Sequence, residues 1–266
     1  MAHDNIRYEV DDGLAVLTID RPDKRNAMTY GMLNAFNEAV AAASGDADVR
    51  VLLLVGSGGA FCAGTDLSDL AATPEDQRGS TGRPAAGGGE GRRTPWPLAS
   101  CPKPVVAAVD GPAVGMGAEL SSQCDLRIAS SRARFAWNFV HRGLVPDTGA
   151  GTWILPRIVG LPAALRLLYT GEFIDATEAL RLGYVDRVVE PEVLMDEAVA
   201  LARQAASGSP LSARLIKQLV YDGLERDRVE HLRAHAEAIA TCFASEDHRE
   251  GVASFLERRP PRFTGR

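Results

Sequence analysis

The sequence predicts an α/β fold with a helical C-terminal region. Two short apolar runs, Val51 to Val55 and Val105 to Val109, have the composition of strands that are buried on both faces. Each run leads into a glycine-rich turn and then into a segment of helical composition. After Glu192 almost every segment repeats apolar residues at helical spacing. We therefore expect buried strands connected by helices, and helices alone toward the end of the chain.

Composition and charge narrow the class of protein. The chain has 266 residues, of which 45% are hydrophobic and 24% are charged, as in ordinary globular proteins with one sizeable core. The net charge of −6 argues against a nucleic-acid partner, because such surfaces need clustered Lys and Arg. The polar, acidic N-terminus resembles no signal peptide, and no apolar run approaches the length of a membrane span. We expect a cytoplasmic protein with no membrane partner.

The cysteines and histidines do not indicate a metal site. Cys62, Cys101, Cys124 and Cys242 are scattered without CxxC spacing, so we interpret them as reduced thiols. His231 and His235 stand four residues apart on an expected helix, which is a metal-pair spacing, but no third ligand is near them in the sequence. We interpret them as part of a solvated helical face, and we expect no bound metal.

The N-terminal part of the chain begins with a hairpin and a helix. Ile6 to Val10 and Leu14 to Ile19 flank the turn signal Asp11-Asp12-Gly13, which predicts a β-hairpin. Thr29 is a plausible N-cap for a helix that ends near Ala43. The apolar residues that recur there at helical spacing are Met32, Phe36, Ala39, Val40 and Ala43.

One segment has the composition of an insertion. Thr73 to Pro97 is dominated by Gly, Pro, Arg and polar residues, and strand-like sequence resumes only at Val105. We expect a mobile insertion over one face of the fold. Its glycine run follows no strand and lacks the Lys-Ser/Thr pair of a phosphate-binding loop, so it does not indicate a nucleotide site.

The stretch from Val105 to Ile128 carries the first indication of a reaction site. Its strand is followed by the turn signal Asp110-Gly111-Pro112 and by Gly115-Met116-Gly117, which opens a segment of helical composition. The first N–H groups of a helix have no partner within it, and small residues let another molecule approach them. Such a turn can hold an anion or a developing oxyanion, and Glu119 lies one turn further along. The alternative is a packing turn with a solvated Glu.

A second turn repeats this pattern. Gly56 to Gly64 follows the strand at Val51 to Val55 and leads into Thr65 and a probable helix start. Two such turns from separate strands can present two backbone donors to one oxygen, which is the geometry of an oxyanion hole. The alternative is a pair of unrelated packing loops.

The remainder of the chain predicts two more strands and then mostly helices. Leu126 to Ala129 and Ala133 to Phe135 have strand composition, and Asp147 lies at a loop-to-helix junction, where it could be either a functional carboxylate or an N-cap. The helices expected after it are Pro162 to Tyr169, Ala176 to Leu182, Val193 to Ala206, Leu211 to Tyr221, Arg226 to Phe243 and Glu246 to Leu256, with one strand at Val185 to Val189.

Motifs along nearly the whole chain resemble those of the crotonase superfamily, the enoyl-CoA hydratase/isomerase proteins. In order they are DRPDKRNAM, AFCAGTDLSDL, KPVVAAVDGPAVGMGAEL, CDLRIAS, ARFAWNFVHRGLVPDTGAGTWILPRIVG and EGVASFLERRPPRF. The resemblance implies a spiral of ββα units followed by a helical C-terminal region. We place the spiral core and acyl-CoA site in residues 1–195 and the helical oligomerisation region in residues 196–266.

The resemblance also implies the substrate class and the assembly. The substrate would be an acyl-CoA thioester whose carbonyl oxygen is held by two backbone N–H groups, here those of Thr65 and Met116. Coenzyme A would be part of the substrate, and no further cofactor is expected. Met116 stands where the family usually has Gly, so it can donate only if its φ is negative, and its side chain should narrow the acyl pocket. The assembly would be a homotrimer or a dimer of trimers.

The surface for coenzyme A is also implied by the resemblance. The loop of Arg25, Asn26 and Ala27 would take the adenine and pantetheine together with Ala63, Asp66 and Leu67. Ser68 stands where hydratases often carry Lys. Contacts to the phosphates would then come from Lys24, Arg25, or the C-terminal Arg258, Arg259 and Arg262.

The catalytic carboxylates depart from the hydratase pattern. Glu119 matches the first of the two Glu residues that hydratases use, whereas the second aligns with Phe139, which cannot exchange protons. Asp147 matches a position that certain enoyl-CoA isomerases use as a general base. We therefore expect the movement of a double bond from the 3-enoyl to the 2-enoyl position, with Asp147 abstracting a proton and Glu119 delivering or holding one.

Three alternatives stay open at this point. Glu119 and Asp147 could together orient a water for hydration of a 2-enoyl thioester. Asp147 could act as a nucleophile, as in the related aroyl-CoA dehalogenases, although those carry Trp where Phe139 sits. The chain could also be a non-catalytic acyl-CoA-binding protein.

Overall fold

The structure is a computed structural model that describes residues 4–73 and 96–266. The insertion expected between Thr73 and Pro97 falls almost entirely on residues 74–95, which lie outside the described residues.

The chain begins with the expected hairpin. Strands β1 (Ile6–Asp11) and β2 (Leu14–Ile19) are antiparallel, with Asp11 opposite Leu14. Asp12 and Gly13 both have positive φ, 45° and 76°, as a two-residue type I′ turn requires. The hairpin prediction is therefore confirmed.

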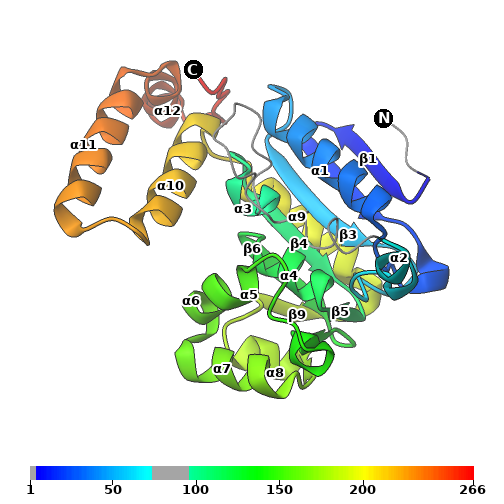
Figure 1. The fold of residues 1–266 in the computed structure, drawn as a ribbon. Helices are drawn as coiled ribbons and strands as arrows, with labels where there is room; N and C mark the ends of the chain where they lie inside the picture. The colour runs from blue at the N-terminus through cyan, green and yellow to red at the C-terminus, as the bar shows by residue number, and fades with distance from the viewer. Residues whose placement is uncertain (1–3, 74–95) are drawn as a thin grey trace.

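A six-stranded sheet forms one layer of the body (Figure 1). Its order is β1-β2-β3-β4-β6-β9, and every neighbouring pair after β1–β2 is parallel. The further strands are β3 (Val51–Gly56), β4 (Val105–Val109), β6 (Leu126–Ser130) and β9 (Arg187–Val189). The last strand begins at Arg187 and not at Val185, because Val185 packs into the core and the carboxylate of Asp186 accepts the Arg127 N–H at 2.7 Å.

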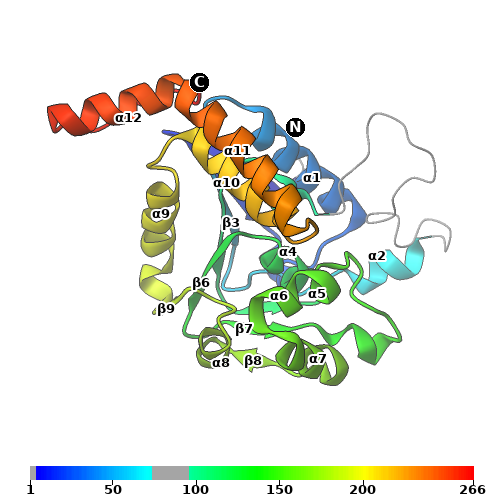
Figure 2. The same ribbon diagram turned by 90° about the vertical axis from the view of Figure 1, so that its left-hand side faces the viewer.

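A second sheet of three short strands lies across the end of the first (Figure 2). Its order is β5-β7-β8, with β5 (Pro112–Val114), β7 (Arg134–Ala136) and β8 (Ile174–Asp175). The sequence did not predict β5, whose three residues directly follow the turn at Asp110 and Gly111. From β4 to β7 successive strands alternate between the large and the small sheet, and each pair of strands, β4–β5 and β6–β7, is followed by helical segments; β8 then returns to the small sheet and β9 to the large one. This alternation is the expected spiral of ββα units.

The large sheet is covered on both faces. Helix α1 (Tyr30–Gly45) packs on one face, and Phe36 shares a core there with Leu52 and Leu54. Its N-cap is Thr29, whose hydroxyl accepts the Met32 N–H at 3.2 Å, as expected. Helix α9 (Leu194–Ala205) packs on the other face, where Ala198 shares a separate core with Leu53. Successive residues of β3 thus point into two different cores, which confirms a strand buried on both faces.

Short helices connect the strands of the two sheets. They are α2 (Leu67–Ala72), α3 (Pro97–Ser100), α4 (Met116–Ser122), α5 (Ala150–Trp153), α6 (Leu155–Val159), α7 (Leu161–Thr170) and α8 (Ala176–Arg181). Single turns of 3₁₀-helix are η1 (Pro22–Lys24), η3 (Asn138–Arg142) and η4 (Pro191–Val193).

The last three helices stand away from the sheets (Figures 1 and 2). They are α10 (Pro210–Gly223), α11 (Arg228–Ala244) and α12 (Glu246–Glu257). Lys217 anchors α10 to the body, since its ammonium donates to Asp125 at 2.8 Å and to the carbonyls of Leu98 and Lys103. The division of the chain at residue 195 stays a prediction. Helix α9 spans that division and belongs by its packing to the sheet.

Candidate active site

The two glycine turns meet directly. The N–H of Val114 donates to the carbonyl of Cys62 at 2.9 Å, which joins the segment after β3 to β5. A β-carbon on Gly117 would stand 2.1 Å from the same carbonyl oxygen, so only glycine allows this approach. Gly115, at φ 53° and ψ −116°, occupies a backbone region that only glycine adopts without strain, and it turns the chain into α4.

The two residues expected to supply the backbone donors line one cavity. Thr65 and Met116 both line it, and a β-carbon on Gly64 would lie 3.9 Å from the Met116 nitrogen. Met116 begins α4 and is not among the residues with positive φ, so the conformation expected for it is confirmed. Within residues 4–73 and 96–266, no acceptor is found for either N–H. Both donors are therefore available to a ligand in this cavity.

The cavity has a volume of about 1060 Å³. Its wall is built from the loop before α1, from α2, from the turn before α4, from η3, and from the loop that ends at Asp147. The sequence-predicted residues that line it, besides Thr65, Met116 and Asp147, are Lys24, Ala27, Ala63, Asp66, Leu67, Ser68 and Phe139. Segments far apart in the chain thus contribute to one site.

Glu119 is buried beside this cavity and not in its open part. Its side chain is fully inaccessible, and Thr148 Oγ1 donates to its Oε2 at 2.6 Å. Burial raises the pKa of the Glu119 carboxyl to about 8, and the nearby charge of Asp147 adds to this, while the Thr148 hydrogen bond works in the opposite direction. Glu119 is consequently protonated at neutral pH.

Asp147 lines the cavity on the turn between η3 and α5. It is not the N-cap of α5, because Gly149 holds that position. Part of the residue is solvent-exposed, yet the surrounding cavity walls desolvate the carboxyl group and raise its pKa to about 6. A hydrogen bond from the Thr148 N–H acts in the opposite direction and lowers the pKa. Asp147 is thus ionised at neutral pH, when Glu119 is not.

Phe139 makes one side of the cavity apolar. It lies on η3 and is only 7% exposed. Its ring tip lies 3.8 Å from the position of a β-carbon on Gly115, so the ring stands next to the turn that carries the Met116 donor. On this side the cavity therefore presents a hydrocarbon surface.

The family is decided by the whole chain together with this geometry. A model of the enoyl-CoA hydratase/isomerase family matches residues 9–266. The chain belongs to this family. It is an enzyme of the enoyl-CoA hydratase/isomerase type, and its fold is that of the crotonase superfamily.

Relatives in the enoyl-CoA hydratase/isomerase family match over their full length. The crotonyl-CoA hydratase of Syntrophomonas wolfei is 39% identical over 264 residues, covering 99% of either chain. The 1,2-epoxyphenylacetyl-CoA isomerase of Escherichia coli is 36% identical over 265 residues, covering 98% of either chain. The crystal structure of an enoyl-CoA hydratase from Bacillus anthracis aligns with a TM-score of 0.90 at 31% identity, covering 98% of this chain and all of that one.

Part of the expected coenzyme A surface has a structural role instead. Asn26 is fully buried, and its amide donates to the carbonyls of Ser57 at 2.9 Å and Ala60 at 2.7 Å, so it holds its loop against the turn after β3. The Asn26 side chain is therefore used for packing and does not line the cavity, whereas contact of this loop with the ligand stays a prediction. Asp66 lines the cavity, but its carboxylate caps α2 and forms an ion pair with Arg21 at 2.7 Å.

The basic residues considered for the phosphates are divided between two places. Lys24 lines the cavity, whereas Arg25 is exposed beside it and does not. Arg258, Arg259 and Arg262 follow α12, at the other end of the molecule from α2 (Figure 1), and do not line the cavity. Arg259 is already paired with Glu250 and Glu257. Lys24 is the group from this set that the structure brings to the site.

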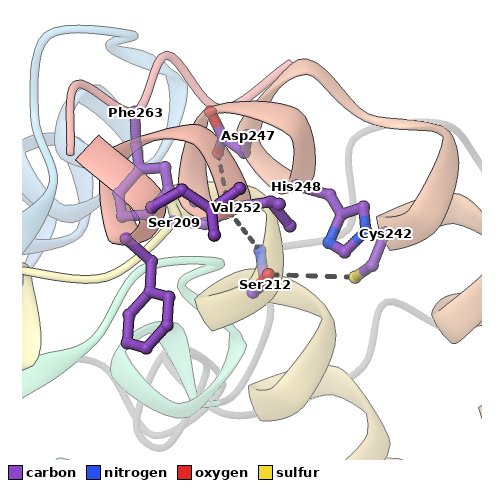
Figure 3. Close-up of a pocket in the computed structure, with 10 residues that line it drawn as sticks. Ser209, Ser212, Cys242, Asp247, His248, Val252 and Phe263 are labelled. Carbon is purple, nitrogen blue, oxygen red and sulfur yellow. Dashed lines mark hydrogen bonds between the residues drawn. The ribbon is translucent and has the colours of Figure 1, made fainter. Parts of the chain in front are cut away.

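A second cavity of about 530 Å³ lies among α10, α12 and the C-terminal tail (Figure 3). It gathers Ser209, Asp247, His248 and Cys242, residue types that can form catalytic triads. Their bonds are those of helix caps, because the Ser209 hydroxyl accepts the Ser212 N–H and donates to Asp247 at 2.6 Å, and the Asp247 carboxylate accepts tail N–H groups. The ring of His248 packs edge-on against Phe243. This cluster holds the tail in place.

The described residues contain no group of three or more His, Cys, Asp or Glu side chains arranged to hold a metal ion. Among the helices of residues 4–73 and 96–266, none has both the length and the apolar character needed to span a bilayer.

Proposed function

We propose that this enzyme isomerises 3-enoyl-CoA thioesters to 2-enoyl-CoA thioesters. The observation that supports this is a pair of carboxyl groups around one cavity in opposite protonation states at neutral pH, Asp147 with a pKa of about 6 and Glu119 with a pKa of about 8. Environments that separate two pKa values in this way assign a base and an acid. Moving a double bond requires one of each.

The reaction divides among four groups. The N–H groups of Thr65 and Met116 hold the thioester oxygen. Asp147 takes a proton from C2, so the C2–H electron pair enters a dienolate whose negative charge rests on that oxygen. Glu119 gives its proton to C4, and the double bond moves to C2–C3. Asp147 and Glu119 then return to their starting states by proton exchange with solvent.

The position of Glu119 sets a condition on this reaction. A β-carbon built on Gly151 would lie 2.4 Å from Glu119 Oε1 and 3.1 Å from the Pro146 ring, so the carboxyl group and this ring are close neighbours. Pro146 itself lines the cavity. Glu119 therefore lies directly behind the wall to which Pro146 belongs, and the bound acyl group must reach that wall. Catalytic contacts that are long in a free enzyme commonly shorten when substrate binds.

Phe139 favours isomerisation over hydration. A hydrocarbon ring near the reacting carbons offers no hydrogen bond to a nucleophilic water, whereas proton transfer between carbons needs none. Hydration remains the second candidate, because the relative from Syntrophomonas wolfei is named a crotonyl-CoA hydratase. In that reaction Glu119 and Asp147 would orient the water together.

A panel of 2-enoyl and 3-enoyl thioesters tests the proposal. We expect conversion of 3-enoyl thioesters, followed by the absorbance of the conjugated product, to be faster than hydration of the matched 2-enoyl thioesters. Faster hydration would select the hydratase. Tight acyl-CoA binding without turnover of any member of the panel would select a non-catalytic binding protein.

A further inference from the structure

We propose that Thr148 is a positioning residue for Glu119, whose hydroxyl fixes Oε2 and so leaves Oε1 as the oxygen that carries the transferable proton. This inference rests on the proposed isomerisation and adds a residue and an atom to it.

The direction of the hydrogen bond follows from the partners of Thr148. The Ala150 N–H donates to Thr148 Oγ1 at 3.2 Å, so that oxygen is an acceptor on one side. No other acceptor for the hydroxyl hydrogen is found among the described residues, so this hydrogen points along the 2.6 Å contact to Glu119 Oε2. In a neutral carboxyl group the carbonyl oxygen is the stronger acceptor, so the oxygen that accepts this hydrogen bond is assigned as the carbonyl oxygen and the other as the one that carries the proton. The proton of Glu119 therefore sits on Oε1.

The surroundings of Oε1 agree with this assignment. It is a buried atom with no hydrogen bond of ordinary geometry among the described residues, although the backbone N–H groups of Gly151 and Ala150 lie near the carboxyl group and act to lower its pKa. It lies against the Gly151 backbone and beside Pro146, the neighbour that lines the cavity. A buried polar atom without a partner calls for an explanation. Here the explanation is that Oε1 is held ready for a ligand carbon and is left without a competing acceptor.

Thr148 is itself held from the other side. The indole Nε1–H of Trp96 donates to the Thr148 carbonyl at 2.8 Å, and the Trp96 ring packs against Trp153 at 5.2 Å between centroids. Thr148 is thus fixed at its backbone by an aromatic pair and at its hydroxyl by two polar partners. The turn that places Asp147 at the cavity therefore also places the side chain of Thr148 against Glu119.

The same hydrogen bond serves the chemical step. When Glu119 protonates C4, its Oε1–H bond breaks, the electron pair stays on the carboxylate, and a C4–H bond forms. The Thr148 hydroxyl then donates to a charged acceptor, and such hydrogen bonds are stronger than neutral ones. Thr148 consequently makes Glu119 a better proton donor than it would be alone.

The first experiment measures the Glu119 proton without turnover. Infrared difference titration of the full-length protein, with Glu119→Gln to identify the band of the protonated carboxyl, gives the midpoint of its ionisation. We expect Thr148→Val, which keeps the shape and removes the hydroxyl, to raise this midpoint by about one pH unit. Thr148→Ser, which keeps a hydroxyl, should recover most of the shift. An unmoved midpoint in Thr148→Val overturns the inference.

The second experiment separates the two proton transfers. A 3-enoyl thioester in deuterium oxide reports removal of the C2 proton by deuterium uptake into recovered substrate, and delivery to C4 by product formation. We expect Thr148→Val to lower product formation on the order of 10–100-fold while C2 exchange by Asp147 continues, so the ratio of exchange to isomerisation rises. A merely structural role would lower both rates together, and that outcome overturns the inference.

Control variants keep the two proposals distinguishable. Thr152→Val removes an exposed hydroxyl from the same segment, one that donates to the Gly149 carbonyl, and should leave both readouts unchanged. If Glu119→Gln still isomerises, the proposed function fails; if only Glu119→Gln is impaired and Thr148→Val behaves like the native enzyme, this inference alone fails. Should Thr148→Val not fold, Trp96→Phe removes the hydrogen bond to the Thr148 carbonyl and should change the same ratio in the same direction.

Discussion

The carboxyl group of Glu119 lies against the backbone of Gly151, so closely that a β-carbon on residue 151 would stand 2.4 Å from Glu119 Oε1. A real β-carbon cannot occupy that position unless the carboxyl group moves. The absence of a side chain at residue 151 is therefore what allows Glu119 to lie where it does.

Gly151→Ala tests this relationship. We expect the methyl group to displace the Glu119 carboxyl group and to lower kcat on the order of 100-fold, as misplacement of a reacting group by about 1 Å typically does. Gly45→Ala is the matched control, because a β-carbon there would meet nothing within 4 Å. Steady-state kinetics of both variants decide the matter, and an equal, small effect of the two substitutions would contradict it.

The pH dependence of isomerisation should be bell-shaped. Asp147 must be ionised to accept a proton, so kcat/KM should fall as the pH drops below about 6. Glu119 must be protonated to donate one, so kcat/KM should also fall as the pH rises above about 8. The profile is measured on a 3-enoyl thioester across this range. A rate that keeps rising above pH 9 would exclude Glu119 as the acid.

Burial of Glu119 should also make the native state depend on pH. The folded-state pKa of about 8 lies above the ordinary value of 4.5, so between these values the folded protein binds more protons than the unfolded chain. Stability contributed by Glu119 is complete below pH 4.5 and is lost as the pH rises toward 8, by up to about 1.4 kcal/mol per pH unit. The Glu119→Gln variant has no ionisable group at this position, so its stability should not show this decrease with rising pH. In urea unfolding at pH 5.5 and pH 8, the variant should gain stability relative to the native enzyme at the higher pH.

Much of the fold was predictable because the signals for its strands and helix caps lie in short stretches of sequence. The hairpin follows from Asp12 and Gly13, and the first helix begins where its Thr29 cap predicts. Strand β5 was missed because it has only three residues and begins with a proline, and neither feature gives a strand signal. Pairing with β7 supplies what the local sequence does not.

The sequence predicted the residues of the two glycine turns that line the cavity, but not the residues that hold those turns and Glu119 in place. Glycine patterns and the resemblance pointed to Thr65 and Met116. Asn26 belongs to another of the matching motifs, DRPDKRNAM, but its side chain is used for packing, which only its burial reveals. Thr148 was missed because a threonine after an aspartate carries no signal of its own. The run of small residues at 149–151 was the available indication that a side chain elsewhere needs that space.

Contact between the two glycine turns gives a test of the oxyanion hole. A β-carbon on Gly117 would lie 2.1 Å from the Cys62 carbonyl oxygen, so Gly117→Ala should push the turns apart and separate the Thr65 and Met116 donors. We expect a loss of about 10²–10³ in kcat, the effect of removing one such donor. Deuterium uptake at C2 should fall equally, because both proton transfers pass through the same dienolate. Retained exchange would show that the donors do not hold the thioester oxygen.

Exposed apolar side chains on the last three helices lead to a prediction about assembly. Ile216 and Val220 on α10 are 61% and 60% exposed, and Phe255 and Leu256 on α12 are 82% and 74% exposed. Large apolar side chains that gather on a surface mark an interaction site. We expect α10–α12 to join copies of the chain into trimers or multiples of three, as light scattering can measure.

The double substitution Phe255→Asp and Leu256→Asp should shift the enzyme toward monomers. Leu180→Asp, on helix α8 at the opposite end of the molecule, should not (Figure 1). A native chain that stays monomeric across micromolar concentrations would contradict the assembly itself.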